Sequence, residues 1–122
     1  MDDARPLSLL IVEDEAMVLA LLRRGAEAAG CVVAATASTV AEALALIDAP
    51  ARAFDAALID ANLRGAPAGP VAACLRYRGL PYVVITGYTP EHVADIACGA
   101  TVLRKPFRAA ALAEALRGLH PE

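Results

Sequence analysis

The sequence predicts an α/β fold in which five parallel strands form one sheet and helices cover both of its faces. Short apolar runs alternate five times with segments whose apolar residues have helical spacing. The 122 residues have the length of one domain, and no repeat, low-complexity tract or linker interrupts the alternation. We therefore expect a single domain over residues 1–122, with no residues left for an output domain.

The first unit begins with a strand expected at residues 7–12, a run that is apolar apart from Ser8 and typical of a strand buried on both faces. A helix is expected after the acidic residues 13–15 and ends at Gly30, because glycine is common just past a helix C-terminus. The residues that fall on one helical stripe are Val18, Leu21, Leu22 and Gly25.

The second unit begins with a strand expected at residues 31–37, which contains β-branched valine and threonine. Thr39 and Glu42 have the spacing of a capping box, in which both side chains accept hydrogen bonds from free backbone N–H groups at a helix start. The apolar residues that follow at helical spacing are Val40, Ala43, Leu44 and Ile47.

The third strand is expected at residues 54–59, directly before Asp60. The glycines and prolines of residues 65–70 indicate a loop, and Pro70 suits the first turn of a helix that runs through Arg78. A fourth strand is expected at residues 81–85.

Thr89 is expected to open the fourth helix, which Gly99 ends. The apolar residues that share one face of this helix are Val93, Ile96 and Ala97. A fifth strand is expected at residues 100–104 and a closing helix at 109–119. The inward residues of the closing helix are expected to be Leu112, Ala115, Leu116 and Leu119.

Composition and charge argue against several functional classes. With 58% hydrophobic and 20% charged residues, the chain is expected to fold. The longest stretch without a charge, residues 28–41, is shorter than the ~20 apolar residues of a membrane span, and the acidic Met1-Asp2-Asp3 lacks the basic flank of a signal peptide. The net charge of −3 argues against nucleic-acid binding. Cys31, Cys74 and Cys98 lack metal or redox spacing, so we expect reduced thiols in a cytoplasmic protein.

Polar residues with reactive groups follow four of the five predicted strands. They are Glu13, Asp14, Asp60, Thr86 and Lys105. In an open parallel sheet, ligands bind beyond the carboxyl ends of the strands, where these residues are expected to converge. Three carboxylates brought together repel one another, and a divalent cation such as Mg²⁺ removes that cost.

A metal ion and Lys105 together supply positive charge for a phosphoryl group, to which the Thr86 hydroxyl can donate a hydrogen bond. We expect Asp60 to be the nucleophile that forms an aspartyl phosphate, because it stands alone at a strand end in the middle of the sheet.

Each of these residues also has a plainer interpretation. An aspartate at a strand end, such as Asp60, often caps a helix. Glu13 and Asp14 can simply stabilise the N-terminus of the first helix through their negative charge. Thr86 can be an ordinary strand residue and Lys105 a surface charge. Because the groups needed for phosphoryl transfer occur together at four strand ends, we prefer the functional interpretation.

Other candidate sites are weaker. His92 and His120 have no partners at metal-ligand spacing, and the glycines form no nucleotide-binding loop.

Four motifs resemble the signature of the receiver domain of two-component response regulators. They are residues 11–15 (IVEDE), Asp60, residues 85–87 (ITG) and residues 104–107 (RKPF). The resemblance covers essentially the whole chain in order and spacing. It implies a flavodoxin-like (βα)5 sandwich with strand order 2-1-3-4-5.

The resemblance also implies roles for individual residues. Asp60 would accept a phosphoryl group from a histidine kinase or histidine phosphotransfer protein, and Thr86 and Lys105 would contact that group. The residues implied as the Mg²⁺ site are Asp14 and Asp60 as direct ligands, Glu13 through a water molecule, and Asn62 through its backbone carbonyl. A receiver assists its own phosphorylation without being a turnover enzyme.

A narrower resemblance is to the single-domain FAT GUY regulators of bacteria, whose motif is close to PFxFATGY. The resemblance lies in residues 58–63 (LIDANL), 70–72 (PVA) and 81–88 (PYVVITGY). The positions that depart from the motif are Tyr82, Val84 and Ile85. Members of that group act in stress-response phosphorelays, which the resemblance implies here.

Two departures from the general receiver pattern affect how a signal is passed on. Val102 stands where most receivers have an aromatic switch residue, so we expect Thr86 and Tyr88 to form the switch and to change the face of the fourth helix, fifth strand and fifth helix. Asn62-Leu63-Arg64-Gly65 replaces the usual Met-Pro, and Asn62 and Tyr88 are expected to tune the lifetime of the phosphate.

Three other functions stay open. The chain can be a pseudo-receiver that binds partners without phosphorylation, or a receiver excised from a hybrid histidine kinase. A phosphatase of the haloacid-dehalogenase kind usually has a second Asp two residues after its nucleophile, and here that position is Asn62. The docking surface for the kinase is expected on the first helix and the loop after the fifth strand.

Overall fold

The computed structural model describes residues 6–119, so Met1-Asp2-Asp3 and His120 lie outside it. Within that range, five parallel strands form the sheet in the spatial order β2-β1-β3-β6-β7. Their bounds are Ser8–Val12 for β1, Val32–Ala37 for β2, Ala56–Asp60 for β3, Tyr82–Thr86 for β6 and Val102–Arg104 for β7. Numbered along the chain, these five strands have the predicted order 2-1-3-4-5, and the flavodoxin-like fold is confirmed.

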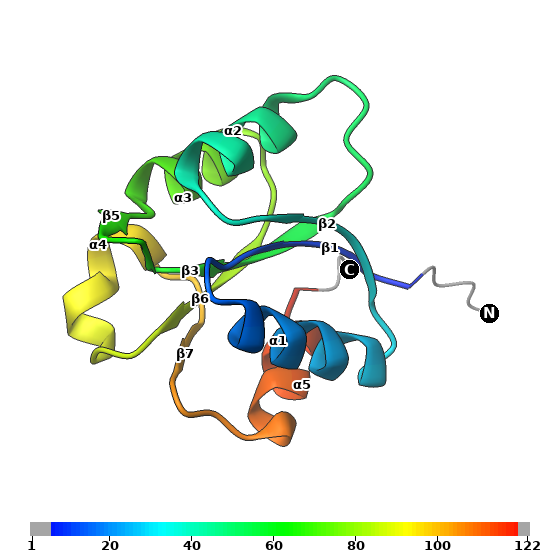
Figure 1. Cartoon of the computed structure of the whole chain (residues 1–122), viewed down its shortest axis with the longest axis vertical. Helices are drawn as coiled ribbons and strands as arrows, with labels where there is room; N and C mark the ends of the chain where they lie inside the picture. Colours follow the sequence, from blue (N-terminus) through cyan, green and yellow to red (C-terminus); the bar gives the residue numbers. More distant parts are fainter. Residues whose placement is uncertain (1–5, 120–122) are drawn as a thin grey trace.

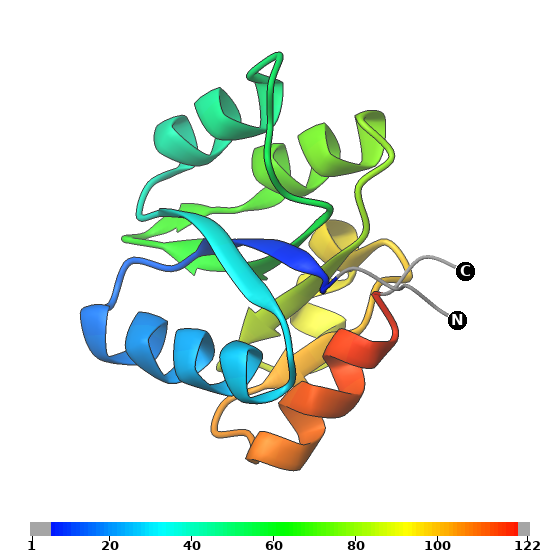
Figure 2. The same cartoon turned by 90° about the vertical axis from the view of Figure 1, so that its right-hand side faces the viewer.

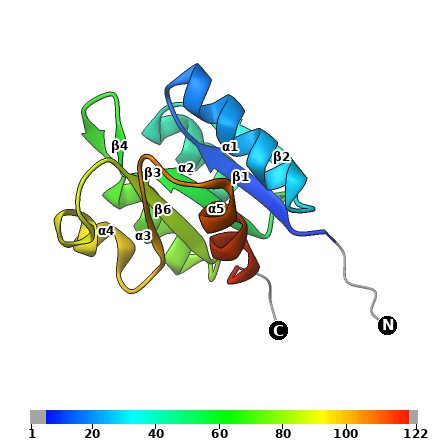
Figure 3. The ribbon, with the colours of Figure 1, turned by 90° about the horizontal axis from the view of Figure 1, so that it is seen from below.

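Helices cover both faces of the sheet (Figures 1 and 2). One face carries α1 (Ala16–Ala28) and α5 (Ala109–Arg117), which lie together on the side seen in Figure 3. The other face carries α2 (Val40–Asp48), α3 (Gly69–Tyr77) and the short α4 (Ala94–Ala97), which follows the 3₁₀ turn η1 (Pro90–Val93). Within residues 6–119, no helix has the length and apolar character needed to cross a membrane.

Each strand contributes to two cores because successive side chains point to opposite faces of the sheet. On β1, Leu9 and Ile11 pack toward α1 and α5, while Leu10 and Val12 pack toward α2 and α3. This burial on both faces explains the continuous apolar run of the strand. Gly25 lets α1 and α5 approach closely, since a Cβ atom there would lie 2.5 Å from Leu112 Cδ2.

The apolar stripe of α1 is not buried along its whole width. Leu22 and Ala26 are fully buried, but Leu21 is 59% exposed. The helix meets the sheet along residues spaced four apart, which turns Leu21 toward the gap between α1 and α5. There it lines an apolar hollow of about 490 Å³ together with Phe107 and Val18. Leu21 therefore shares the apolar stripe but is not part of the buried core.

Two local predictions are only partly confirmed. Thr39 Oγ1 accepts a hydrogen bond from the Glu42 N–H at 3.1 Å, but the Glu42 carboxylate accepts from the backbone N–H of Ser38 instead of Thr39. The fourth helix is shorter than expected, because Pro90–Val93 forms a 3₁₀ turn before the single α-helical turn of α4.

The loop expected after Asp60 contains a small antiparallel hairpin of β4 (Asn62–Leu63) and β5 (Ala66–Pro67). These strands are not predictable from the sequence, because two-residue strands carry too little periodicity to be recognised. The hairpin lies beside the carboxyl end of β3, next to the residues described below.

Candidate functional site

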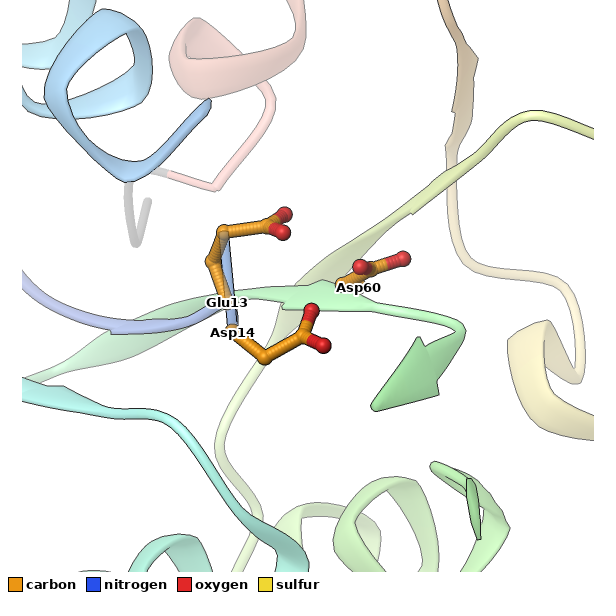
Figure 4. A group of neighbouring side chains, drawn as sticks. All are labelled: Glu13, Asp14 and Asp60. Carbon is orange, nitrogen blue, oxygen red and sulfur yellow. The ribbon is translucent and has the colours of Figure 1, made fainter. Parts of the chain in front are cut away.

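The predicted carboxylates converge at the carboxyl ends of β1 and β3. Glu13 and Asp14 directly follow β1, and Asp60 is the last residue of β3. These two strands are neighbours and run parallel, so their ends meet at the same edge of the sheet. One oxygen from each carboxylate lies within 4.8 Å of the others, and Figure 4 shows the three side chains gathered at this edge.

Lys105 lies at the same edge, directly after β7. Its Nζ atom lies 3.7 Å from Asp60 Oδ2 and 3.8 Å from Glu13 Oε1. The backbone of Lys105 is held by a 2.7 Å hydrogen bond from its N–H to the Thr86 carbonyl, and the Lys105–Pro106 peptide is cis. One ammonium group thus faces two of the three carboxylates.

Glu13 is the most deeply buried member of the cluster, with 1% of its surface exposed. Its Oε2 atom accepts a hydrogen bond from the Glu15 N–H at 3.2 Å, whereas Oε1 has no hydrogen-bond partner among residues 6–119. Burial, reinforced by the negative charge of Asp60, raises the pKa of the Glu13 carboxyl from 4.5 to about 7. The surroundings of Glu13 therefore do not fully stabilise its ionised carboxylate with positive charge or hydrogen-bond donors.

Asp60 is also buried, and burial raises its pKa, although Lys105 and the backbone N–H of Asn62 act in the opposite direction. The Asn62 N–H donates to Asp60 Oδ1 at 3.4 Å, while the Asn62 side chain is exposed. Asp14 is mostly buried, and its Oδ2 atom accepts a 3.0 Å hydrogen bond from the backbone N–H of Arg64.

The donors present fit a hard divalent cation. The cluster offers only oxygen ligands, and the single ammonium group of Lys105 faces two of the three carboxylates while the buried Oε1 atom of Glu13 has no hydrogen bond among residues 6–119. Mg²⁺ prefers carboxylate oxygens and retained water molecules, which suits the three side chains beside an open cleft.

Thr86 ends β6, the next strand in the sheet, and is buried. Its Oγ1 atom accepts a 3.0 Å hydrogen bond from the backbone N–H of Tyr88, which leaves the hydroxyl hydrogen free to donate. The ring of Tyr88 is about half exposed and stacks on His92, with 5.6 Å between the ring centroids. A hydrogen bond therefore links the side chain of Thr86 to the backbone of Tyr88.

An open cleft of about 500 Å³ lies at this edge of the sheet. Five of the predicted site residues line it, whereas Glu13 and Thr86 are not among its lining residues; the five are Asp14, Asp60, Asn62, Tyr88 and Lys105. Arg64 and Gly65 also line the cleft, and neither was predicted as a site residue. The available signal was Gly65 alone, since tight hairpin turns need positive φ values that glycine adopts readily, whereas arginine is not a preferred residue of such turns.

Comparisons with known proteins agree with this arrangement. A family model described as the response regulator receiver domain matches residues 9–117. The solution structure of SdrG from Sphingomonas melonis Fr1 is similar, with 37% identity, a TM-score of 0.78, and coverage of 93% of this chain and 96% of that one. A BeF3-activated conformation of SdrG, from Pseudomonas melonis Fr1, matches at 36% identity with the same TM-score and coverage.

A response regulator receiver protein from Sinorhizobium medicae WSM419 has 28% identity and a TM-score of 0.81, with coverage of 93% of this chain and 94% of that one. No curated protein sequence matches the chain.

Proposed function

Since the chain belongs to the response regulator receiver domain family, we propose that it accepts a phosphoryl group on Asp60 in a Mg²⁺-dependent reaction. The donor is a histidine kinase or a histidine phosphotransfer protein. The observation that carries this proposal is the meeting of three carboxylates within 4.8 Å, with the Lys105 ammonium 3.7 Å from Asp60.

The transfer is a displacement at phosphorus. One oxygen of the Asp60 carboxylate attacks the phosphorus of a phosphohistidine on the donor, and an O–P bond forms as the P–N bond breaks. The electron pair of the broken bond returns to the imidazole nitrogen, which takes up a proton from solvent. Hydrolysis later breaks the O–P bond when water attacks the phosphorus, which releases inorganic phosphate and restores Asp60. The protein assists both steps on itself and is not a turnover enzyme.

The remaining site residues hold the metal ion and stabilise the negative charge. Asp14 and Asp60 would bind Mg²⁺ directly, Glu13 would bind through a water molecule, and Asn62 through its backbone carbonyl. When bound, the ion supplies positive charge to the oxygens of the phosphoryl group. Lys105 pairs with another of these oxygens.

Thr86 donates the hydrogen of its hydroxyl to the phosphoryl group, which is supported by its position at the end of β6.

We place the docking surface for the donor on α1 and the loop after β7, because α1 begins directly after Glu15 and the loop begins at Lys105, and both of these residues line the cleft. The support is that Met17 and Leu21 of α1 are largely exposed apolar side chains, and that Leu21 lines the apolar hollow to which Phe107 contributes. Charge reversal at Arg23 or Arg24 should slow transfer from the kinase, whereas unchanged transfer rates would exclude this surface.

The output of the protein is a contact with another protein or the phosphate that it holds. We propose that Thr86 moves toward the phosphoryl group, that Tyr88 follows because its N–H is bonded to Thr86 Oγ1, and that the face of α4, β7 and α5 changes. A Tyr88→Ala variant should be phosphorylated but signal poorly. Normal signalling by that variant would contradict the switch.

On the resemblance to FAT GUY regulators, we propose that the protein is a stand-alone receiver of a cytoplasmic stress-response phosphorelay, either as a signalling protein or as a phosphate sink. The match to SdrG, at 37% identity over 93% of this chain, supports a receiver of similar size.

The deciding experiment is incubation with a small phosphodonor such as phosphoramidate and Mg²⁺, followed by intact mass spectrometry. We expect one phosphoryl group that is stable to acid and labile to base, absent from Asp60→Ala and absent without Mg²⁺. Lys105→Ala should form the adduct slowly. An intact chain without any adduct would instead identify a pseudo-receiver, and labelling at another residue would overturn the role of Asp60.

A further inference from the structure

A two-residue turn brings a second cation to the mouth of the cleft. The strands β4 and β5 pair antiparallel, and Arg64 and Gly65 connect them with φ values of 53° and 82°. Two positive φ values are typical of tight hairpin turns that match the twist of the strands. The turn places Arg64 against Asp14, which lies fifty residues earlier in the chain.

Arg64 contacts Asp14 through both its backbone and its side chain. Its N–H donates to Asp14 Oδ2 at 3.0 Å, and the guanidinium Nε lies 4.0 Å from the same oxygen. The Arg64 side chain is 67% exposed and that of Asp14 is 15% exposed, so the cation lies on the solvent side of a mostly buried carboxylate. The backbone contact fixes the turn, while the side chain adds charge.

Two basic side chains, Lys105 and Arg64, therefore lie beside different carboxylates of the acidic cluster. Lys105 faces Asp60 and Glu13 at 3.7 and 3.8 Å, and Arg64 faces Asp14. The phosphoryl transfer described above uses Lys105 but gives no part to Arg64. A basic side chain at the mouth of a metal site nevertheless has an electrostatic effect on whatever enters.

Building on the proposed function, we propose that Arg64 sets the balance between cation and anion in this cleft. Its charge weakens the binding of Mg²⁺ at Asp14 and Asp60 and strengthens the binding of the phosphoryl group. The two effects have opposite signs because a metal ion must share Asp14 with the guanidinium and is repelled by it, whereas a phosphoryl group is attracted.

The test compares Arg64→Gln, which removes the charge, with Arg64→Lys, which keeps it. Both replacements are non-glycine residues at the same positive φ, so the backbone strain is matched. Arg117→Gln is the control, because Arg117 is a similarly exposed arginine, with 69% exposure, on α5. Mg²⁺ affinity is measured by isothermal titration calorimetry, and beryllofluoride affinity in saturating Mg²⁺ by the change in tyrosine fluorescence.

We expect Arg64→Gln to bind Mg²⁺ about three- to tenfold more tightly and beryllofluoride about two- to fivefold more weakly at low salt. Both changes should shrink in ~0.5 M salt, and Arg64→Lys and Arg117→Gln should resemble the wild type. A loss of affinity for both ligands in Arg64→Gln would indicate a structural role and overturn the proposal, as would unchanged affinities. If the wild type itself does not bind Mg²⁺, the proposed function falls and the inference falls with it.

Discussion

Replacing Glu13 by glutamine should remove a buried charge that costs the metal-free protein stability at neutral pH. Burial and the charge of Asp60 raise the pKa of Glu13 from 4.5 to about 7 in the folded protein. Because the folded pKa lies above the unfolded value, the contribution of Glu13 to stability is fully present below about pH 4.5. It is lost as the pH rises through about 7.

The size of the effect follows from these two pKa values. At about 1.4 kcal/mol for each pH unit between them, full ionisation costs the folded protein ~3 kcal/mol, of which roughly 2–3 kcal/mol develops between pH 5 and pH 8. Glutamine has a similar shape and carries no charge. Glu13→Gln should therefore be more stable than the wild type at pH 8, with a smaller difference at pH 5.

The assay is urea unfolding followed by circular dichroism, in EDTA, at pH 5 and pH 8. Asp60 contributes to the pH dependence of both proteins, so the informative quantity is the difference in unfolding free energy between them at each pH. Saturating Mg²⁺ should reverse the order at pH 8, because the bound ion favours the charged carboxylate. A wild-type advantage at pH 8 in EDTA, or a difference that does not change with pH, would refute the reasoning.

Two further substitutions test the packing. Gly25→Ala should destabilise the fold by ~1–3 kcal/mol in urea unfolding, because the new Cβ atom would lie 2.5 Å from Leu112 Cδ2. The control Gly69→Ala should not destabilise the fold, because a Cβ atom there meets nothing within 4 Å. Equal losses of stability in the two variants would contradict the close approach of α1 and α5. Tyr82→Phe should cost ~1–2 kcal/mol, because the buried hydroxyl hydrogen-bonds the last carbonyls of α4 and an arginine, while the exposed Tyr77→Phe should be neutral. An unchanged free energy of unfolding in Tyr82→Phe would show that these hydrogen bonds add nothing to the stability of the fold.

The strands and the main site residues were predictable because both follow from local patterns. Apolar runs such as residues 7–12 must be buried on both faces, and parallel strands bring their carboxyl ends to one edge. Glu13, Asp14, Asp60 and Lys105 therefore had to converge once the five strands paired in parallel. The roles assigned to them remain predictions that the phosphorylation experiment tests.

Features that depend on contacts between distant segments were not predictable in the same way. Leu21 has the spacing of an inward residue, but the angle at which α1 meets the sheet leaves it beside the hollow next to α5. The carboxylate of Glu42 bonds to Ser38 although the spacing with Thr39 suggests a reciprocal capping box. In both cases several partners are compatible with the pattern, and packing selects one.

The amino-acid order by itself determined that this chain folds as alternating strands and helices and that acidic, hydroxyl and basic groups stand at the strand ends. Burial of apolar side chains at regular spacing is a local requirement, so it can be recognised along the chain. Only the tertiary structure decided that Glu13 loses its contact with water and that Arg64 meets Asp14. Both outcomes depend on how the β4–β5 turn and the ends of separate strands pack together, since the energy of a charge is set by its surroundings in space.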